Sequence, residues 1–267
     1  MQGRRLLCAA TVVLAVFAPA RGTGQQAPSS HVLREGEELT YNVRYGPFDL
    51  GSVRIKTLSR SQAQASVRYE CKALIDSYPK VPFVDLHAVF ESILDTAFFS
   101  HRFIGKLKQD DRWDFSRYLF DYPRHLAYLE KGEHDTAVTK RDTVSVDAAF
   151  QDGLSLFFYA RDQLFSGKTV DVPTMINEQK VNTRIEFLGK RDGVEIDAVD
   201  YPVDVVGFEG HAEFVGIFGL TGGFEGWFSN DEARVPIMAK MKVIIGSVTI
   251  ELMQWKRQGW TPPKSKG

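Results

Sequence analysis

The sequence contains very little cysteine. Its 267 residues include only Cys8 and Cys71. Cys8 lies within an apolar run near the N-terminus, and if that run is removed Cys71 has no partner for an internal disulfide. Because Cys71 shares the alternating apolar phase of Val67 and Tyr69, we expect a small core residue and not a reactive thiol.

The sequence also lacks an excess of charge of either sign. It has 33 basic and 34 acidic side chains, with a formal net charge of −1. Nucleic-acid-binding proteins present a basic surface to the phosphates, so this balance argues against that class. After the first twenty residues no apolar run approaches the roughly 20 residues that a membrane-spanning helix needs.

The N-terminus has the pattern of a secretory signal peptide. Arg4 and Arg5 precede the apolar run Leu6–Ala18, and a small residue follows at Ala20. We predict a signal peptide over residues 1–20 and an exported protein of the periplasm or outer cell envelope. Cleavage near Ala20 would leave about 245 residues, enough for one large β domain. An uncleaved anchor is the alternative; lipidation at Cys8 is disfavoured because no apolar region precedes it.

Most of the remaining chain alternates between apolar and polar residues, which is typical of half-buried β-strands. Residues 21–34 predict a flexible tether, 35–257 a β domain, and 258–267 a disordered basic tail. Turns are predicted at 131–133 and 189–193. The predicted strands are 39–45, 51–56, 63–72, 84–92, 98–107, 112–121, 125–130, 134–140, 168–175, 179–189, 193–200, 235–245 and 246–256.

One segment, 152–165, has helical periodicity. Leu154, Phe157 and Phe158 recur with Arg161 at intervals of three and four residues. Asp152 or Ser155 could cap its start, and a glycine follows its end. We expect this helix to pack against a sheet; the alternative is a lid that contacts lipid.

About a dozen strands and one helix predict a mainly β fold, either a single antiparallel β-barrel-like structure or a strongly curved open sheet with one main α-helix. A sandwich of two sheets is the alternative. Aromatic residues are frequent on the predicted strands. They would either fill the interior or line a cavity for an apolar ligand.

Sequence motifs for catalysis and metal binding are absent or incomplete. Gly167-Lys168-Thr169 resembles the end of a phosphate-binding loop, but Asp162 stands where that loop needs glycine. No Gly-x-Ser-x-Gly sequence occurs, and the six histidines lack the spacing of a zinc site. Asp110-Asp111 and Asp231-Glu232 are more typical of solvated turns. We predict no metal site, no cofactor and no catalytic residue.

The segment Gly216–Gly226 combines five glycines with Phe218, Leu220 and Phe224. Glycine permits tight bends and positive φ, so we expect an irregular loop that re-enters the sheet. The alternative is a gate over a pocket.

Several ordered segments resemble one bacterial exported family. Gly36–Tyr41 with Gly51-Ser52-Val53 is similar to its opening strands, and Asp152–Arg161 to its central helix. Gly226–Asp231 followed by Arg234-Val235-Pro236 is the strongest match. The family is the domain of unknown function 3108. The resemblance implies an envelope protein of antiparallel β structure but no reaction. Such curved sheets are loosely similar to the periplasmic lipoprotein carriers LolA and LolB, a likeness of fold alone.

These observations favour a non-enzymatic envelope protein that binds an apolar ligand, such as a lipid or acyl chain, in a concave pocket. The alternative is a protein–protein interaction module in envelope assembly. A hydrolase using Asp231, Arg161 or His211 is a third hypothesis. The expected ligand-binding residues are Phe157, Phe158, Arg161, Phe224, Trp227 and Phe228.

Overall fold

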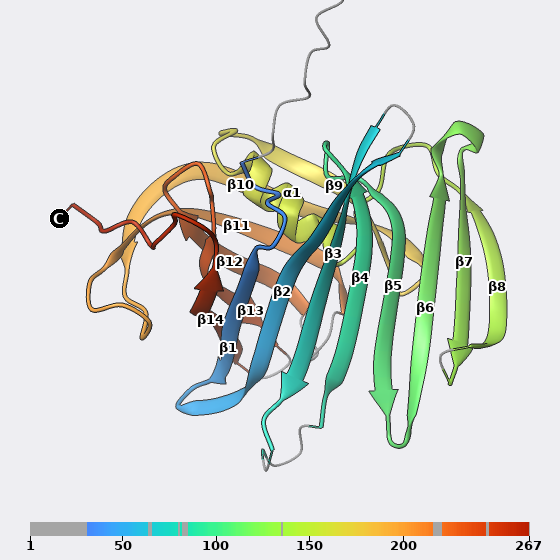
Figure 1. Ribbon diagram of the computed structural model, residues 1–267, viewed down its shortest axis with the longest axis horizontal. Coiled ribbons are helices and arrows are strands. Elements are labelled where there is room, and N and C mark those ends of the chain that lie inside the picture. The colour runs from blue at the N-terminus through green and yellow to red at the C-terminus, as the bar shows by residue number, and fades with distance from the viewer. Residues whose placement is uncertain are drawn as a thin grey trace, which may run out of the picture.

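In the part of the chain that the structure describes, one antiparallel sheet of fourteen strands wraps around a single α-helix, α1 (Ser155–Gln163) (Figure 1). The computed structural model describes residues 31–63, 66–79, 81, 85–134, 136–215, 221–243 and 246–266. The predicted signal peptide and most of the predicted tether lie outside the described residues.

The strands fall into two groups, separated in the sequence by α1. The first group is β1 (Glu38–Tyr45), β2 (Phe48–Ala63), β3 (Ser66–Ser77), β4 (His87–Asp95), β5 (Ser100–Gln109), β6 (Arg112–Asp121), β7 (Leu126–Glu133) and β8 (Ala137–Ser145). A short 3-10 helix, η1 (Tyr122–Arg124), connects β6 to β7. The second group is β9 (Thr169–Ile176), β10 (Gln179–Val194), β11 (Val203–Val215), β12 (Thr221–Ser229), β13 (Pro236–Lys242) and β14 (Ser247–Lys256).

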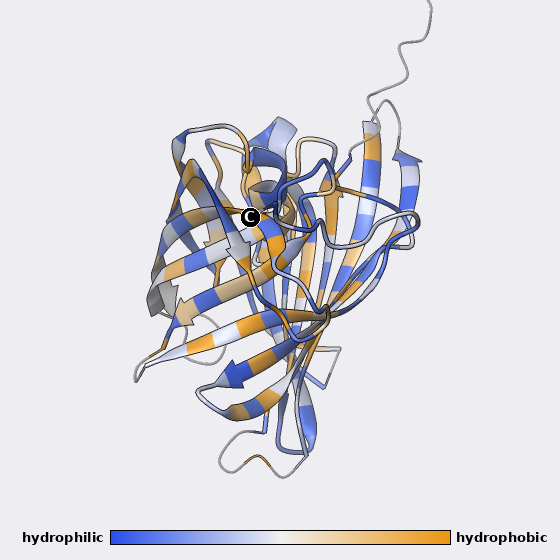
Figure 2. Cartoon of the chain, turned by 90° about the vertical axis from the view of Figure 1, so that its left-hand side faces the viewer, coloured by the Kyte–Doolittle hydropathy of each residue, from blue (hydrophilic) through white to orange (hydrophobic). Residues whose placement is uncertain are grey.

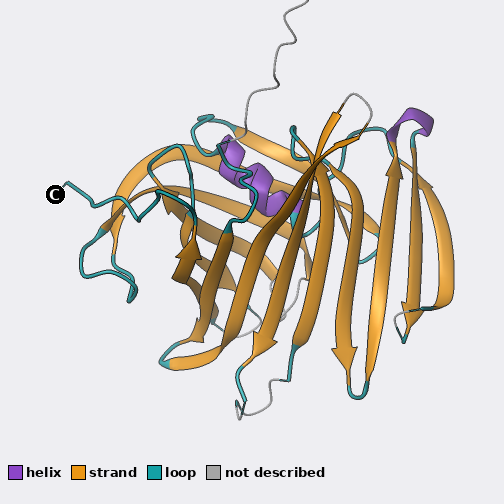
Figure 3. Ribbon diagram, in the orientation of Figure 1, coloured by secondary structure: helices purple, strands orange, loops and turns teal. Residues whose placement is uncertain are grey.

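Each group is a meander, and the two meanders join where the first strand pairs with the last. The order runs from β8 down to β1, then β14, then down to β9. β8 and β9 are therefore the two edges, and no ladder joins them among the described residues. The prediction of a strongly curved open antiparallel sheet is confirmed (Figure 3). The alternative of two separate sheets is wrong, because one continuous ladder links all fourteen strands.

The sheet curves because one face is apolar and because the ladder contains bulges. β3 alternates strictly between partly exposed and buried residues along most of its length, and the same alternation of hydropathy marks other strands in Figure 2. Register shifts occur at Thr40/Tyr41, Val43/Arg44 and Thr57/Ser59. A bulge bends its strand and increases the local twist, so these shifts help the sheet to wrap around the apolar side chains.

α1 lies on the concave side, at the end of the sheet where η1 lies (Figures 1 and 3). Leu154, Phe158 and Leu164 are buried there, which confirms that the apolar stripe packs inward. The helix is shorter than the predicted 152–165. Asp152 precedes it and accepts hydrogen bonds from the backbone N–H groups of Leu154 (2.7 Å) and Ser155 (2.8 Å).

The connection from β8 to α1 crosses the open side of the sheet. In this closing segment, residues 146–152, Phe150 O accepts a hydrogen bond from the Ser100 N–H of β5 (3.0 Å). Gln151 forms a short parallel bridge to β9, with Gln151 N donating to Pro173 O at 2.9 Å and Met175 N donating to Gln151 O at 2.8 Å. The closing segment thus joins the first meander to the second at the end that holds α1.

Two predicted turns are wrong. Residues 131–133 lie within β7, and the turn follows them. Residues 189–193 lie within β10, where a register shift between Glu186 and Lys190 forms a bulge and Gly189 has φ of +68°. The predicted strand 193–200 is consequently wrong after Val194, where β10 ends. A glycine-rich polar stretch fits both a turn and a bulge, so composition alone could not separate them.

The segment rich in glycine and phenylalanine forms strands. Phe208 of β11 lies opposite Gly226 of β12, and Phe224 lies opposite Gly210. A Cβ added at Gly226 would come within 2.4 Å of the Phe208 ring, and one at Gly210 within 2.1 Å of the Phe224 ring. Each ring thus occupies the space over the opposite glycine. The predicted irregular loop is wrong for residues 221–226, while 216–220 lie outside the described residues.

The C-terminal residues pack against the sheet. Val203 bridges to Lys264, and the Trp260 indole N–H donates to Asp231 Oδ2 at 2.8 Å. The predicted disordered tail is therefore wrong for residues 258–266. Val32 and Leu33, at the end of the predicted tether, are buried in the core.

Asp152 generates a prediction about pH. Its carboxylate is fully buried, and burial raises its pKa. Hydrogen bonds from groups such as Ser92 lower the pKa, but the effect of burial is larger. The unfolded chain releases this proton above about pH 4, before the folded chain does, so the folded state loses stability as pH rises through the folded pKa. We expect the stability of Asp152→Asn relative to the natural chain to increase with pH above about 4.

The measurement is urea unfolding between pH 3.5 and 7.5. Asp111→Asn, in the exposed β5–β6 turn, is the control and should show no such trend. If the stability difference between Asp152→Asn and the natural chain is constant with pH, or falls as pH rises, the raised pKa of Asp152 is contradicted.

Candidate functional site

The concave side of the sheet contains a cavity of about 750 Å³. Its wall comes from strands of both meanders and from one side of α1. Most of the lining residues are apolar, among them Val53, Ile55, Ile75, Phe90, Phe103, Leu156, Met175, Ile185, Phe208, Met238 and Ile250. The cavity arises because α1 fills only one end of the concave space.

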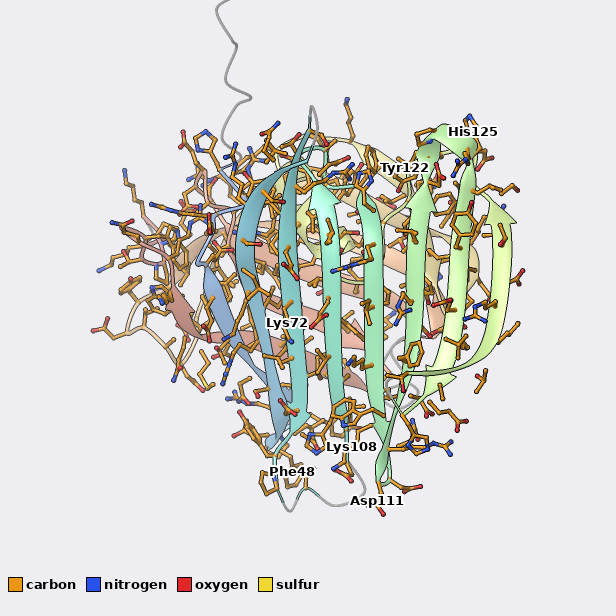
Figure 4. All side chains as sticks on the ribbon, turned by 45° about the vertical axis from the view of Figure 1, so that its right-hand side comes forward. Phe48, Lys72, Lys108, Asp111, Tyr122 and His125 are labelled. Carbon is orange, nitrogen blue, oxygen red and sulfur yellow. The ribbon has the colours of Figure 1, made fainter. Side chains whose placement is uncertain are left out.

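The cavity extends toward the end of the sheet opposite η1. Figure 4 marks the two ends: Tyr122 and His125 lie at the η1 end, whereas Phe48, Lys108 and Asp111 lie at the opposite end. The charged residues of the lining are Lys106, Asp114, Lys131, Glu133, Glu178, Glu225 and Lys242. Several of them lie on the parts of β5, β6 and β7 nearest that opposite end.

One group of polar side chains meets at the cavity wall. Glu178, in the turn between β9 and β10, accepts hydrogen bonds from Ser116 Oγ (2.7 Å) and the Tyr118 hydroxyl (3.1 Å). Its other carboxylate oxygen forms an ion pair with Lys131. The Glu178 backbone N–H donates to the Tyr118 hydroxyl at 3.2 Å. Burial and the nearby Glu178 charge raise the pKa of Tyr118, so its hydroxyl stays protonated.

Sequence reasoning did not identify this Glu178 cluster. Ser116 and Tyr118 lie about 60 residues from Glu178 in the chain, with separations of 62 and 60. Asn177-Glu178 between two alternating runs was a readable turn signal. Nothing in the sequence indicated which strands that turn would contact.

The structure separates the six expected ligand-binding residues into two groups. Phe157, Phe224 and Phe228 line the cavity. Phe158, a residue of α1, is fully buried, with its ring 5.2 Å from that of Phe157. Trp227 is partly buried and lies under Lys240, whose Nζ is 5.5 Å from the indole centroid. Phe158 and Trp227 are thus not among the lining residues.

Arg161, the sixth expected residue, belongs to a buried ionic cluster. Its guanidinium donates to both carboxylate oxygens of Glu37, at 2.6 and 3.2 Å. It also donates to the backbone carbonyls of Ala233 (2.9 Å) and Arg234 (3.1 Å). Arg257 contacts the same Glu37 carboxylate. With its donors already engaged, Arg161 fixes α1 to the sheet and does not line the cavity.

Burial would raise the pKa of Glu37, but the charges and hydrogen bonds of Arg161 and Arg257 outweigh it and hold the pKa below its usual value. Glu37 is therefore ionised at neutral pH. The cluster joins three distant parts of the chain: the segment before β1, α1, and the segment after β14.

The residues of the hydrolase hypothesis do not form a site. Asp231 accepts hydrogen bonds from Ser229 Oγ (2.8 Å) and from the backbone of Ala233 (3.0 Å), which makes it a turn residue. His211 lies on β11 opposite Gly223 and Arg184. Neither residue has a contact to Arg161 that would assemble an acid, a base and a donor.

Three further features of the described residues complete the description. No group of three or more His, Cys, Asp and Glu within them could hold a metal ion. Cys71 is fully buried, and burial raises the pKa of its thiol. In the described part of the chain no helix is long and apolar enough to cross a bilayer.

Comparison with known proteins places this architecture in a family. The family model for a protein of unknown function, DUF3108, matches residues 40–253. The chain belongs to the DUF3108 family. The expectation drawn from its ordered segments is thereby confirmed. No curated protein matches the chain.

Two solved structures resemble this DUF3108 chain. One is a β-barrel-like protein of the DUF1849 family from Brucella abortus, with a TM-score of 0.51 and 10% identity over 84% of this chain and 99% of that one. The other is a Bacteroides fragilis protein with a YmcC-like fold, with a TM-score of 0.37 and 7% identity over 85% of this chain and 98% of that one. At such identities only the first likeness is informative, and it concerns the fold alone.

The buried cluster generates a stability prediction. Arg161→Ala leaves Glu37 and two backbone carbonyls without their main donor, and breaking a buried ion pair in this way costs about 3–5 kcal/mol. Arg161→Lys should restore only part of that loss, because an ammonium cannot donate in the same bidentate geometry.

Urea unfolding monitored by circular dichroism measures the effect. Arg117→Ala is the control because it removes a partly exposed pair with Glu130 (2.7 Å) on the outer face, where solvated pairs contribute up to about 1 kcal/mol. Equal losses from Arg161→Ala and Arg117→Ala would contradict the role given to the cluster.

Proposed function

We propose that this protein binds an apolar small ligand, such as a lipid acyl chain, in the concave cavity. The observation that carries the proposal is a cavity of about 750 Å³ with a predominantly apolar wall. Sites for small ligands typically occupy 300 to about 1,000 Å³ and combine apolar walls with a few polar groups. Binding would remove this apolar surface from water, which supplies the driving force.

The protein–protein module has less support. Such a module needs an exposed apolar patch, but Leu154, Phe158 and Leu164 around α1 are buried. The edge strand β8 is largely exposed and carries Lys140, Arg141 and Asp142 in succession. Charged residues on an edge strand oppose pairing with another strand.

We further propose that the protein acts after export, in the periplasm or outer envelope, because residues 1–20 have the pattern of a signal peptide. Intact mass measurement on protein recovered from the exported fraction should show the loss of these residues. Replacing Arg4 and Arg5 by Glu should leave the full-length chain in the cytoplasm. Recovery of that variant from the exported fraction at the mass of the full-length chain would contradict the proposal.

A cavity-filling variant tests the binding function. Ala73 of β3 is buried and lines the cavity, whereas the neighbouring Leu74 lies outside it. We expect Ala73→Phe to weaken binding of the neutral fluorophore N-phenyl-1-naphthylamine about ten-fold or more, because 1.4 kcal/mol of lost contact already has that effect.

Leu74→Phe places the same phenyl ring on the outer side of the same strand and should leave the affinity unchanged. Fluorescence titration of both variants and of the natural chain gives the dissociation constants. Absence of fluorophore binding to the natural chain, or equal affinities for Ala73→Phe and Leu74→Phe, would contradict binding in this cavity.

A further inference from the structure

The cavity has a seam along one side. β8 and β9 are the two edges of the sheet, and among the described residues no backbone ladder joins the β9–β10 hairpin to β6, β7 or β8. At the end that holds α1, the closing segment crosses this gap through backbone hydrogen bonds to β5 and β9. Farther from α1, side chains cross it.

Glu178 makes the central contacts across this part of the seam. It lies in the β9–β10 turn and reaches β6 through Ser116 and Tyr118, and β7 through Lys131. Nearer α1, Lys180 donates to the backbone carbonyl of Ser145 (3.2 Å), where β8 leads into the closing segment. Glu178 itself belongs to the cavity wall. Its contacts therefore separate the cavity from the outside along the seam.

The turn that carries Glu178 has an unusual residue for its conformation. Asn177 has φ of +51° and Glu178 has φ of +58°. Two-residue hairpin turns with positive φ at both positions favour Asn followed by Gly, because a Cβ is disfavoured in the left-handed region. Glu178 occupies the glycine position, and the buried contacts of its side chain offset the backbone strain.

We propose that the seam is the route by which ligand reaches the cavity, and that Glu178 is the latch that closes it. This inference rests on the proposed function. In the closed state the Glu178 carboxylate holds the β9–β10 hairpin against β6 and β7. When its contacts to Ser116, Tyr118 and Lys131 break together, the hairpin swings outward. The backbone bridge between Gln151 and β9 acts as the hinge, and the apolar wall is exposed at the side of the sheet.

The decisive variant is Glu178→Gly. It removes every side-chain contact of the latch, and it places the residue that this turn favours at that position, so the hairpin should still form. Stopped-flow fluorescence with N-phenyl-1-naphthylamine measures the association and dissociation rates. We expect both rates to rise about ten-fold or more, because several charge-assisted hydrogen bonds that close the seam are lost.

Glu130→Gln is the matched control. Glu130 also lies on β7 and pairs with Arg117 of β6 and Arg141 of β8, but on the outer face. The association and dissociation rates of the fluorophore with Glu130→Gln should equal those with the natural chain. Unchanged rates for Glu178→Gly overturn the latch while leaving the binding function intact. Absence of fluorophore binding to the natural chain overturns the proposed function itself.

A reversible cross-link provides the converse test. Ser116→Cys combined with Glu178→Cys places two thiols across the seam, and Cys71 is too deeply buried to compete for the reagent. A short bis-methanethiosulfonate linker should slow fluorophore exchange about ten-fold or more, and reduction should reverse the effect. Equal exchange rates before and after reduction would show that ligand uses another route.

Discussion

The buried contact between Arg161 and Glu37 holds the structure around the cavity together. An open curved sheet exposes a wide apolar concave face, and α1 covers only part of it. Arg161 ties α1 to the segment before β1 through Glu37 and to the turn before β13 through two backbone carbonyls. Arg257, in the segment after β14, contacts the same Glu37 carboxylate and so ties that segment to the cluster. Because the donors and acceptors are matched at this point, the helix has one defined position.

That position determines where the cavity lies. Phe158 and Leu164 fill the end of the concave space near η1, and Asp152 fixes the start of the helix through Leu154 and Ser155. Beyond the helix the inward side chains of the two meanders face each other without a layer between them, which leaves the apolar cavity. A sheet closed by a complete ladder would have no edges. Here β8 and β9 remain unpaired with each other, so access from the side is compatible with the architecture.

The sequence predicted the fold class well because local patterns determine it. Alternation along residues 63–72 and the three- and four-residue spacing around Phe157 indicate strand and helix without long-range information. Contacts between distant residues could not be read in this way. Glu37 lies 124 residues from Arg161 in the chain. Arg161 was therefore predicted to bind a ligand, whereas in the structure it binds the Glu37 carboxylate. Glu178 was missed for the same reason. The glycines at 189 and 226 were interpreted as loops, although they mark a bulge and a close ring contact within strands.

We propose that the cavity holds an apolar ligand. Native mass spectrometry with lipid extraction, on protein purified from the exported fraction, measures its presence. We expect a bound species whose mass is lost on organic extraction and which is identified in the extract as a single-chain lipid or related apolar molecule. A single apo mass under gentle ionisation, together with an extract free of lipid and no uptake of added fatty acid, would contradict it.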